Sequence, residues 1–299
     1  MRRTILALAA VLCACSARTD VGAEAPTSTS SPNSGETSPA SSVEEYFAGV
    51  EAGLTDRERA SVKAYSEWRE ALLAGKVDPS PDIAENFNAY AKREAEAQGD
   101  PFAQDLLARV KRDQLGRFDI KFVPGQLVSI FRARGLELDP ADESAVNNML
   151  SRDLWKTDKA NTAWLKERLA ANGDHWWPIS EVGEESSNDL WLLVQHADQD
   201  EDFQKHVLSL MEPLAKAGEV NAKNFAYLYD RVNDPQRYGT QLECSDGVFQ
   251  PRPLEDPAHV DELRASVGLG PEAEYVGLSA FDAARDQCAA ESDTQTTAQ

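Results

Sequence analysis

The feature that most constrains the fold is a helix in the middle of the chain that is apolar on nearly all sides. Its apolar side chains follow the i, i+3, i+4, i+7 spacing of a helix stripe at Leu190, Leu193, Val194 and Ala197. Trp191 and Leu192 lie on the other sides of the same helix. A helix of this kind is buried in a soluble protein, so we expect other helices to cover it.

Two polar residues, Gln195 and His196, end this apolar run. Both would lie on a mostly buried element, where polar groups need hydrogen-bond partners. The residues that follow suit the start of another helix, because caps and the helix dipole favour acidic side chains there: Asp198, Asp200, Glu201 and Asp202. We expect this second helix to end near Gly218.

A third helix is predicted between Asn221, which suits an N-terminal cap, and Pro235, which stops a helix. Asp230 and Arg231 lie near its end and, as helix neighbours, point in different directions. Residues 238–241 then read Tyr-Gly-Thr-Gln in irregular structure, where functional side chains are common. The same four residues also suit a structural turn in which the glycine has a positive φ.

The first residues have the pattern of a bacterial targeting signal. Arg2 and Arg3 precede an apolar segment, residues 5–12, that is too short to span a membrane. Residues 12–15, Leu-Cys-Ala-Cys, resemble a lipobox in which Cys15 is lipidated and becomes the first mature residue. Ser16 follows it instead of an inner-membrane retention Asp, which favours the outer membrane of the cell envelope. The alternative is cleavage after Ala17 and release as a secreted or periplasmic protein.

Composition predicts how the chain is held at the envelope and which partners it avoids. Residues 16–42 are rich in Ser, Thr and Pro and contain few large apolar groups, so we expect a disordered tether. The formal charge of −21 disfavours nucleic acid and anionic lipid head groups, because both repel an acidic surface. Contact with the membrane would then occur only through the N-terminal lipid. Cys244 and Cys288 are the remaining cysteines, and in an oxidising compartment we predict that they form a disulfide.

The helical patterns predict an all-α fold, an irregular multi-helix bundle with a long C-terminal polar loop. After the signal (1–15) and tether (16–42), we expect an N-terminal helical segment (43–109), a main helical domain (110–280) and a polar tail (281–299). Within the main domain, residues 140–154 and 158–171 have the pattern of two separate helices, the second capped by Asp158.

An ordered series of short motifs runs from Val110 to Leu278. The series is Asp113-Gln114-x-x-Arg117, Asp158-x-x-Asn161, Trp177-Pro178, Val182-Gly183, Gln195-His196-Ala197-Asp198, Asp230-Arg231 and Tyr238-Gly239-Thr240-Gln241. It resembles a family of uncharacterised bacterial domains that share the QHAD and YGTQ signatures. The resemblance implies a domain boundary and a set of ligand-binding candidates, but no activity: Asp113, Gln114, Arg117, Asp158, Asn161, Gln195, Arg231, Tyr238, Thr240 and Gln241.

His196 is the central candidate, and three roles are open to it. As a general acid or base it needs a carboxylate within hydrogen-bond reach, which makes Asp198 and Asp230 the other catalytic candidates. As a metal ligand it would join Asp198 and Asp200, but consecutive acidic residues at a helix start are usually caps, so we predict no metal. The alternative is a histidine that is hydrogen-bonded in the core or stabilised by the helix dipole.

Three functions fit these patterns. No serine elbow, phosphate loop, dinucleotide fingerprint or HExxH motif occurs, so we predict no cofactor. The favoured hypothesis is a domain that binds a small polar ligand or an envelope glycan around His196 and the YGTQ loop. The alternatives are a hydrolase that uses His196 with an aspartate, and a protein-interaction domain in which the polar residues form a structural network.

Overall fold

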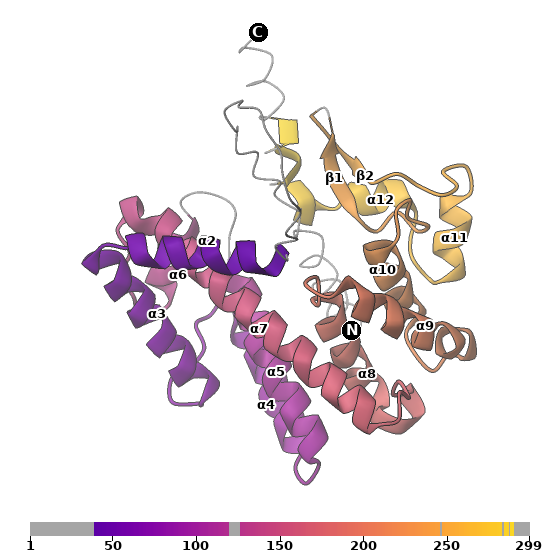
Figure 1. The fold of residues 1–299 in the computed structure, drawn as a ribbon, viewed down its shortest axis with the longest axis horizontal. Helices are drawn as coiled ribbons and strands as arrows, with labels where there is room; N and C mark the ends of the chain where they lie inside the picture. Colours follow the sequence, from indigo (N-terminus) through magenta and orange to yellow (C-terminus); the bar gives the residue numbers. More distant parts are fainter. Residues whose placement is uncertain (1–38, 120–125, 246, 283, 287, 290–299) are drawn as a thin grey trace, which may run out of the picture.

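The computed structural model describes residues 39–119, 126–245, 247–282, 284–286 and 288–289. The predicted signal, the lipobox with Cys15 and most of the predicted tether lie outside these ranges. The helices, in chain order, are α2 (Pro39–Gly53), α3 (Asp56–Leu73), α4 (Ala84–Glu96), α5 (Pro101–Asp119), α6 (Gln126–Ala133), α7 (Glu143–Ala171), α8 (Ile179–Gln195), α9 (Glu201–Ala217), α10 (Ala222–Val232), α11 (Val260–Ser266) and α12 (Glu272–Val276), with short 3-10 turns at Pro140–Asp142 and Ser279–Phe281. This architecture confirms the predicted all-α class (Figure 1).

The longest helix, α7, runs across the molecule and packs against α2, α3, α5, α6 and α8 (Figure 1). The predicted break between residues 154 and 158 is wrong, because α7 is one continuous helix of 29 residues. Residues 155–157, Trp-Lys-Thr, contain no glycine or proline to stop it. Asp158 lies inside the helix, and its carboxylate pairs with Arg117 on α5 instead of capping a helix start.

Two of the buried hydrophobic clusters share α7. The larger cluster surrounds α8 and takes Trp164, Leu165 and Leu169 from the C-terminal half of α7. A second cluster takes Val146 and Leu150 from the N-terminal half, where they pack with residues of α3 and α6. Each half of the helix therefore stabilises a different part of the protein, and α7 connects the two.

The central stretch folds largely as its sequence predicts. The apolar face residues of α8 are buried, which confirms that this helix lies inside the protein. The carboxylate of Asp200 caps α9 by accepting from the backbone N–H of Phe203, and Gly218 ends α9 in a left-handed conformation. The side chain of Asn221 caps α10. No helix in the described part of the chain has the length and apolar character needed to cross a membrane.

The C-terminal region contains a β-hairpin that was not predicted. Strands β1 (Leu242–Ser245) and β2 (Val248–Pro251) pair in antiparallel register directly after the YGTQ loop. The predicted disulfide is confirmed, since Cys244 on β1 is bonded to Cys288. The bond ties the C-terminal region to the hairpin, and Phe281 and Cys288 are both buried.

Candidate functional site

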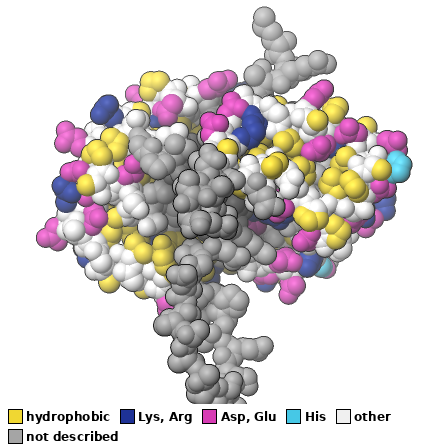
Figure 2. Space-filling view, turned by 90° about the horizontal axis from the view of Figure 1, so that it is seen from above, with side chains coloured by type: hydrophobic (Ala, Val, Ile, Leu, Met, Phe, Trp, Pro, Cys, Tyr) yellow, Lys and Arg dark blue, Asp and Glu magenta, His cyan; other side chains and the backbone are white. Residues whose placement is uncertain are grey.

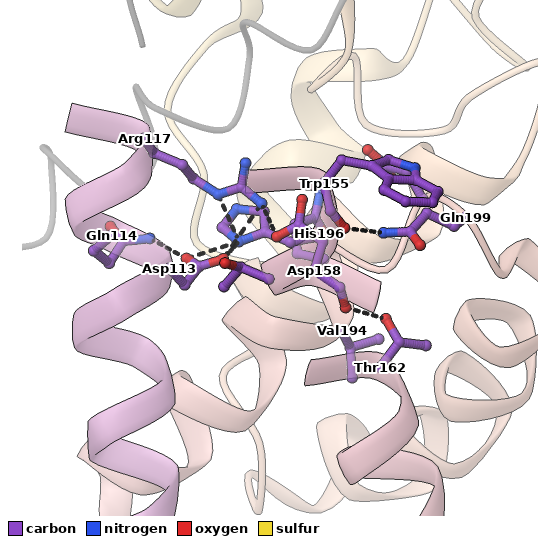
Figure 3. A network of polar contacts seen from close by, with 12 residues as sticks. Asp113, Gln114, Arg117, Trp155, Asp158, Thr162, Val194, His196 and Gln199 are labelled. Atoms are coloured by element: carbon purple, nitrogen blue, oxygen red, sulfur yellow. Dashed lines mark hydrogen bonds and ion pairs between the residues drawn. The ribbon is translucent and has the colours of Figure 1, made fainter. Parts of the chain in front are cut away.

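Three helices bring charged side chains together around His196 (Figure 3). Helix α5 supplies Asp113 and Arg117, which lie four residues apart and so on one face of the helix. Helix α7 supplies Asp158, and His196 directly follows α8 as its C-terminal cap residue. We call these four residues the His196 cluster.

The cluster is held by short contacts between ionisable groups. The imidazole Nδ1 of His196 lies 3.0 and 3.1 Å from the two carboxylate oxygens of Asp113. The guanidinium of Arg117 reaches the same nitrogen through Nε at 2.9 Å and donates through Nη2 to Asp158 at 2.7 Å. Asp113 is fully buried, whereas the side chains of Arg117 and Asp158 keep 11% and 14% of their exposure. The cluster therefore meets solvent only at its Arg117 and Asp158 edge.

The His196 Nδ1 atom cannot donate to Asp113 and accept from Arg117 at the same time. An ionised carboxylate only accepts and a guanidinium only donates, so one of the two contacts is not a hydrogen bond. Arg117 has other acceptors in Asp158 and Asp113. We therefore assign the proton to Nδ1, which donates to Asp113 and leaves Nε2 as the basic nitrogen of a neutral ring.

The pKa values of the three titratable groups are displaced in different directions. Burial lowers the pKa of His196, and the positive charge of Arg117 lowers it further, which favours the neutral imidazole. Burial alone would raise the pKa of Asp113, but Arg117 and His196 hold it below its usual range. Burial raises the pKa of Asp158 well above its usual value. The charge of Arg117 lowers this pKa and the charge of Asp113 raises it, so the net shift is upward. The cluster thus combines a carboxylate whose pKa is lowered, an imidazole that favours the neutral form and a second carboxylate whose pKa is raised.

Asp113, Asp158 and His196 are also spaced like metal ligands. Among the described residues they form a group whose ligand atoms lie within 4.8 Å of one another. Arg117 contacts all three side chains and supplies the positive charge that an ion would otherwise bring. This arrangement favours an arginine-neutralised cluster over a metal centre. The set differs from the sequence-based alternative of His196 with Asp198 and Asp200, since Asp200 caps α9.

Two predicted glutamines lie beside the cluster. Gln114 donates from Nε2 to Asp113 at 2.8 Å and so holds the carboxylate that orients His196. Gln195 is fully buried, and neither its amide nitrogen nor its oxygen has a hydrogen-bond partner within the described residues. A buried amide without partners costs free energy, which a hydrogen bond to a bound water or ligand would recover.

Asp198 and Arg231 form a second polar group, which extends to the YGTQ loop. Arg231 donates from Nε to Asp198 at 2.8 Å and lies 3.4 Å from the side-chain oxygen of Gln241. Gln241 in turn donates to the hydroxyl of Thr240. The carboxylate that is hydrogen-bonded to His196 is thus that of Asp113. Asp198, which the sequence suggested as the hydrogen-bond partner of His196, pairs with Arg231 instead. Asp198 still acts on the ring through its charge, which raises the pKa of His196 less than burial and Arg117 lower it.

Asp230, the other expected partner of His196, organises the YGTQ loop instead. Its buried carboxylate accepts from the backbone N–H groups of Arg237, Tyr238 and Thr240 at 2.8, 3.0 and 2.9 Å. Burial raises the pKa of Asp230, while these three N–H groups oppose the rise. The positive φ expected of Gly239 in this turn is confirmed, at +62°.

Arg264 was not predicted from the sequence, although it completes this loop. It is buried on α11 and donates to the carbonyl oxygens of Tyr238 and Gly270, both at 2.6 Å. An arginine in a short amphipathic helix gives no sequence signal of this role. Asn161 was predicted to join Asp158, but it lines a separate cavity and accepts a hydrogen bond from Arg109.

Residues 139–284 match the family DUF6624. It is a family of unknown function, and the match supports an uncharacterised domain in this part of the chain. No curated protein and no solved structure matches the chain. The DUF6624 match includes Asp158, His196 and Asp230 but not α5, which supplies Asp113 and Arg117. The His196 cluster is thus assembled from residues on both sides of the boundary of the match.

We expect the imidazole of His196 to titrate below the ordinary value of 6.5, whereas the pKa of His259, raised by Asp256, lies above it. Arg117→Gln should raise the pKa of His196, because a positive charge is removed, and Asp113→Asn should lower it. Ring-proton NMR titrations measure both shifts, with His259 as the internal control. If neither variant moves the pKa of His196, the described cluster is wrong.

The same shift affects stability. Because the pKa of His196 is lower in the folded protein, the unfolded chain takes up a proton first as the pH falls below about 6.5. Stability contributed by His196 is then lost toward acid, by at most about 1.4 kcal/mol per pH unit. In His196→Gln, the free energy of unfolding should therefore fall less between about pH 6.5 and lower pH than it does in the wild type.

Asp230→Asn should destabilise the protein by about 2–3 kcal/mol, because an amide cannot accept from three N–H groups as a carboxylate does. Chemical unfolding measures the change in free energy. Asp234→Asn is the matched control, because this substitution makes the same change in charge at an exposed residue four positions away. Equal effects of the two substitutions would show that Asp230 does not hold the loop.

Proposed function

We propose that this domain binds a small polar ligand, such as a sugar of an envelope glycan, at the exposed edge of the His196 cluster. The observation that carries the proposal is the convergence of Asp113, Arg117, Asp158 and His196 from three helices. Arg117 offers N–H donors and Asp158 offers a carboxyl group at this edge, which suits hydroxyl groups of a ligand.

Two further features support a binding role over a purely structural network. Displaced pKa values of opposite direction are typical of functional sites, although structural ion pairs also produce them. The unpartnered amide of Gln195, next to His196 in the chain, is a buried group whose partners a water or ligand would supply. The Asp198–Arg231–Gln241 group would connect such a site to the YGTQ loop.

A hydrolase is the second candidate, and the state of the ring favours it. A neutral histidine that is oriented by a carboxylate, as His196 is by Asp113, can act as a general base. Asp158, whose pKa is raised by burial, would then serve as the general acid. This assignment replaces Asp198 and Asp230 as the acidic partners.

The test is a thermal-shift screen of envelope sugars, amino sugars and peptidoglycan fragments. A true ligand should raise the melting temperature of the wild type, and this shift should be lost in His196→Gln and Asp158→Asn. His206→Gln is the matched control, because His206 is an exposed histidine paired with Asp174 outside the cluster. Mass spectrometry of the same mixtures detects turnover.

The outcomes separate the three functions. Stabilisation without turnover supports binding, and turnover that is lost in His196→Gln supports the hydrolase. A ligand that stabilises His196→Gln as strongly as the wild type contradicts a site at this cluster. If His196→Gln only lowers stability while binding of a partner protein is intact, the network is structural.

We further propose that the domain is held at the cell envelope by a lipid on Cys15. The support is the lipobox-like Leu12-Cys13-Ala14-Cys15 after a short basic and apolar signal. Expressed in bacteria, the wild type should partition into detergent and carry a diacylglyceryl mass, whereas Cys15→Ser should not. Cys13→Ser is the matched control and should stay lipidated. A soluble mature protein that begins at Arg18 would instead support cleavage after Ala17.

A further inference from the structure

A cavity of about 490 Å³ lies between α3, α5 and α7, apart from the His196 cluster. It shares no lining residue with that cluster, although both are built on α5 and α7. Its volume is within the range of pockets that bind small organic molecules. The cavity is therefore large enough to hold a ligand of its own.

The lining of the cavity is cationic in a strongly acidic protein. Four basic side chains line it, Arg69, Arg109, Arg112 and Lys156, against two acidic ones, Asp105 and Asp153. The whole chain has a formal charge of −21, and on the face shown in Figure 2 acidic side chains are more frequent than basic ones. This concentration of positive charge is therefore opposite to the average charge of the protein. Such a local excess attracts anions.

The basic groups differ in how fully they are neutralised. Arg112 forms a bidentate salt bridge with Glu70, with N–O distances of 2.6 and 2.8 Å, and Arg109 contacts Asp105 at 3.1 Å. Arg69 is held loosely, 3.5 Å from Asp153 and 3.7 Å from Glu70. Lys156 is exposed and makes no ion pair with another described residue. Positive charge is thus left for a ligand at Lys156.

A buried amide adds a second and independent observation. Asn161 keeps only 3% of its exposure and accepts from Arg109 through its oxygen at 3.4 Å. Its amide nitrogen has no hydrogen-bond partner within the described residues, and neither has the Nε of Arg69. Unpartnered buried donors cost free energy, which an acceptor oxygen bound in the cavity would recover.

We propose that this cavity binds a small organic anion through an oxyanion group, a phosphate or a carboxylate. Lys156 supplies the uncompensated charge. N–H donors come from the guanidinium groups of Arg69, Arg109 and Arg112, and Asn161 supplies a neutral donor. Guanidinium groups suit this role because their fork of donors matches the oxygens of phosphate and carboxylate. The site is a second binding site, and it does not depend on the function of the His196 cluster.

The experiment is isothermal titration calorimetry of the purified protein with inorganic phosphate, glucose 6-phosphate and succinate at matched ionic strength. We expect at least one of these anions to bind, and the comparison identifies whether phosphate or carboxylate is preferred. Lys156→Gln should weaken that binding about tenfold, the effect of one charge-assisted hydrogen bond. Lys159→Gln is the matched control, because Lys159 lies one turn along α7, pairs with Glu44 and does not line the cavity.

Two results would overturn the proposal. One is the absence of binding by all three anions at millimolar concentration in the folded wild type. The other is an equal loss of affinity in Lys156→Gln and Lys159→Gln, which would indicate a general effect of charge. His196→Gln should bind the anion as the wild type does, so the two proposed sites can fail independently.

Discussion

The fold depends on keeping the buried charges of the His196 cluster compensated. Asp113 has no exposure, and an unpaired ion in such a place is strongly destabilising. Its charge is compensated by Arg117 one turn along α5, and the neutral imidazole at the end of α8 donates a hydrogen bond to it. Helices α5, α7 and α8 must therefore keep their relative positions, because a shift of any one would leave a carboxylate without its partner.

The helices could be predicted where the sequence carries a local signal. The cap at Asn221 and the glycine after α9 each mark a helix end, and the structure has an end at each. The predicted break in α7 had no such signal, since only an acidic residue suggested a cap. The hairpin was missed because its strands have four residues each, too few for a clear alternating pattern.

The members of the candidate site could be named from the sequence, but their pairing could not. Asp113 and His196 are 83 positions apart, and only the packing of α5 against α8 brings them into contact. Asp198 is much closer to His196 in the chain, yet the turn after α8 directs its carboxylate to Arg231. Separation along the sequence predicts which side chains are in contact within a helix, but not between helices. The role of Arg264, which contacts the carbonyl oxygen of Tyr238, was missed for the same reason.

The position of α7 has a consequence for how the protein unfolds. The two halves of α7 belong to different hydrophobic clusters. If either cluster unfolds, it exposes apolar residues of α7, and this helix is also part of the other cluster. The N-terminal helices and the region that matches DUF6624 should thus melt as one cooperative unit. A fragment that begins at residue 139 would keep α7 but lose α5, which packs against it. The apolar face of α7 would then be exposed to solvent and would favour self-association.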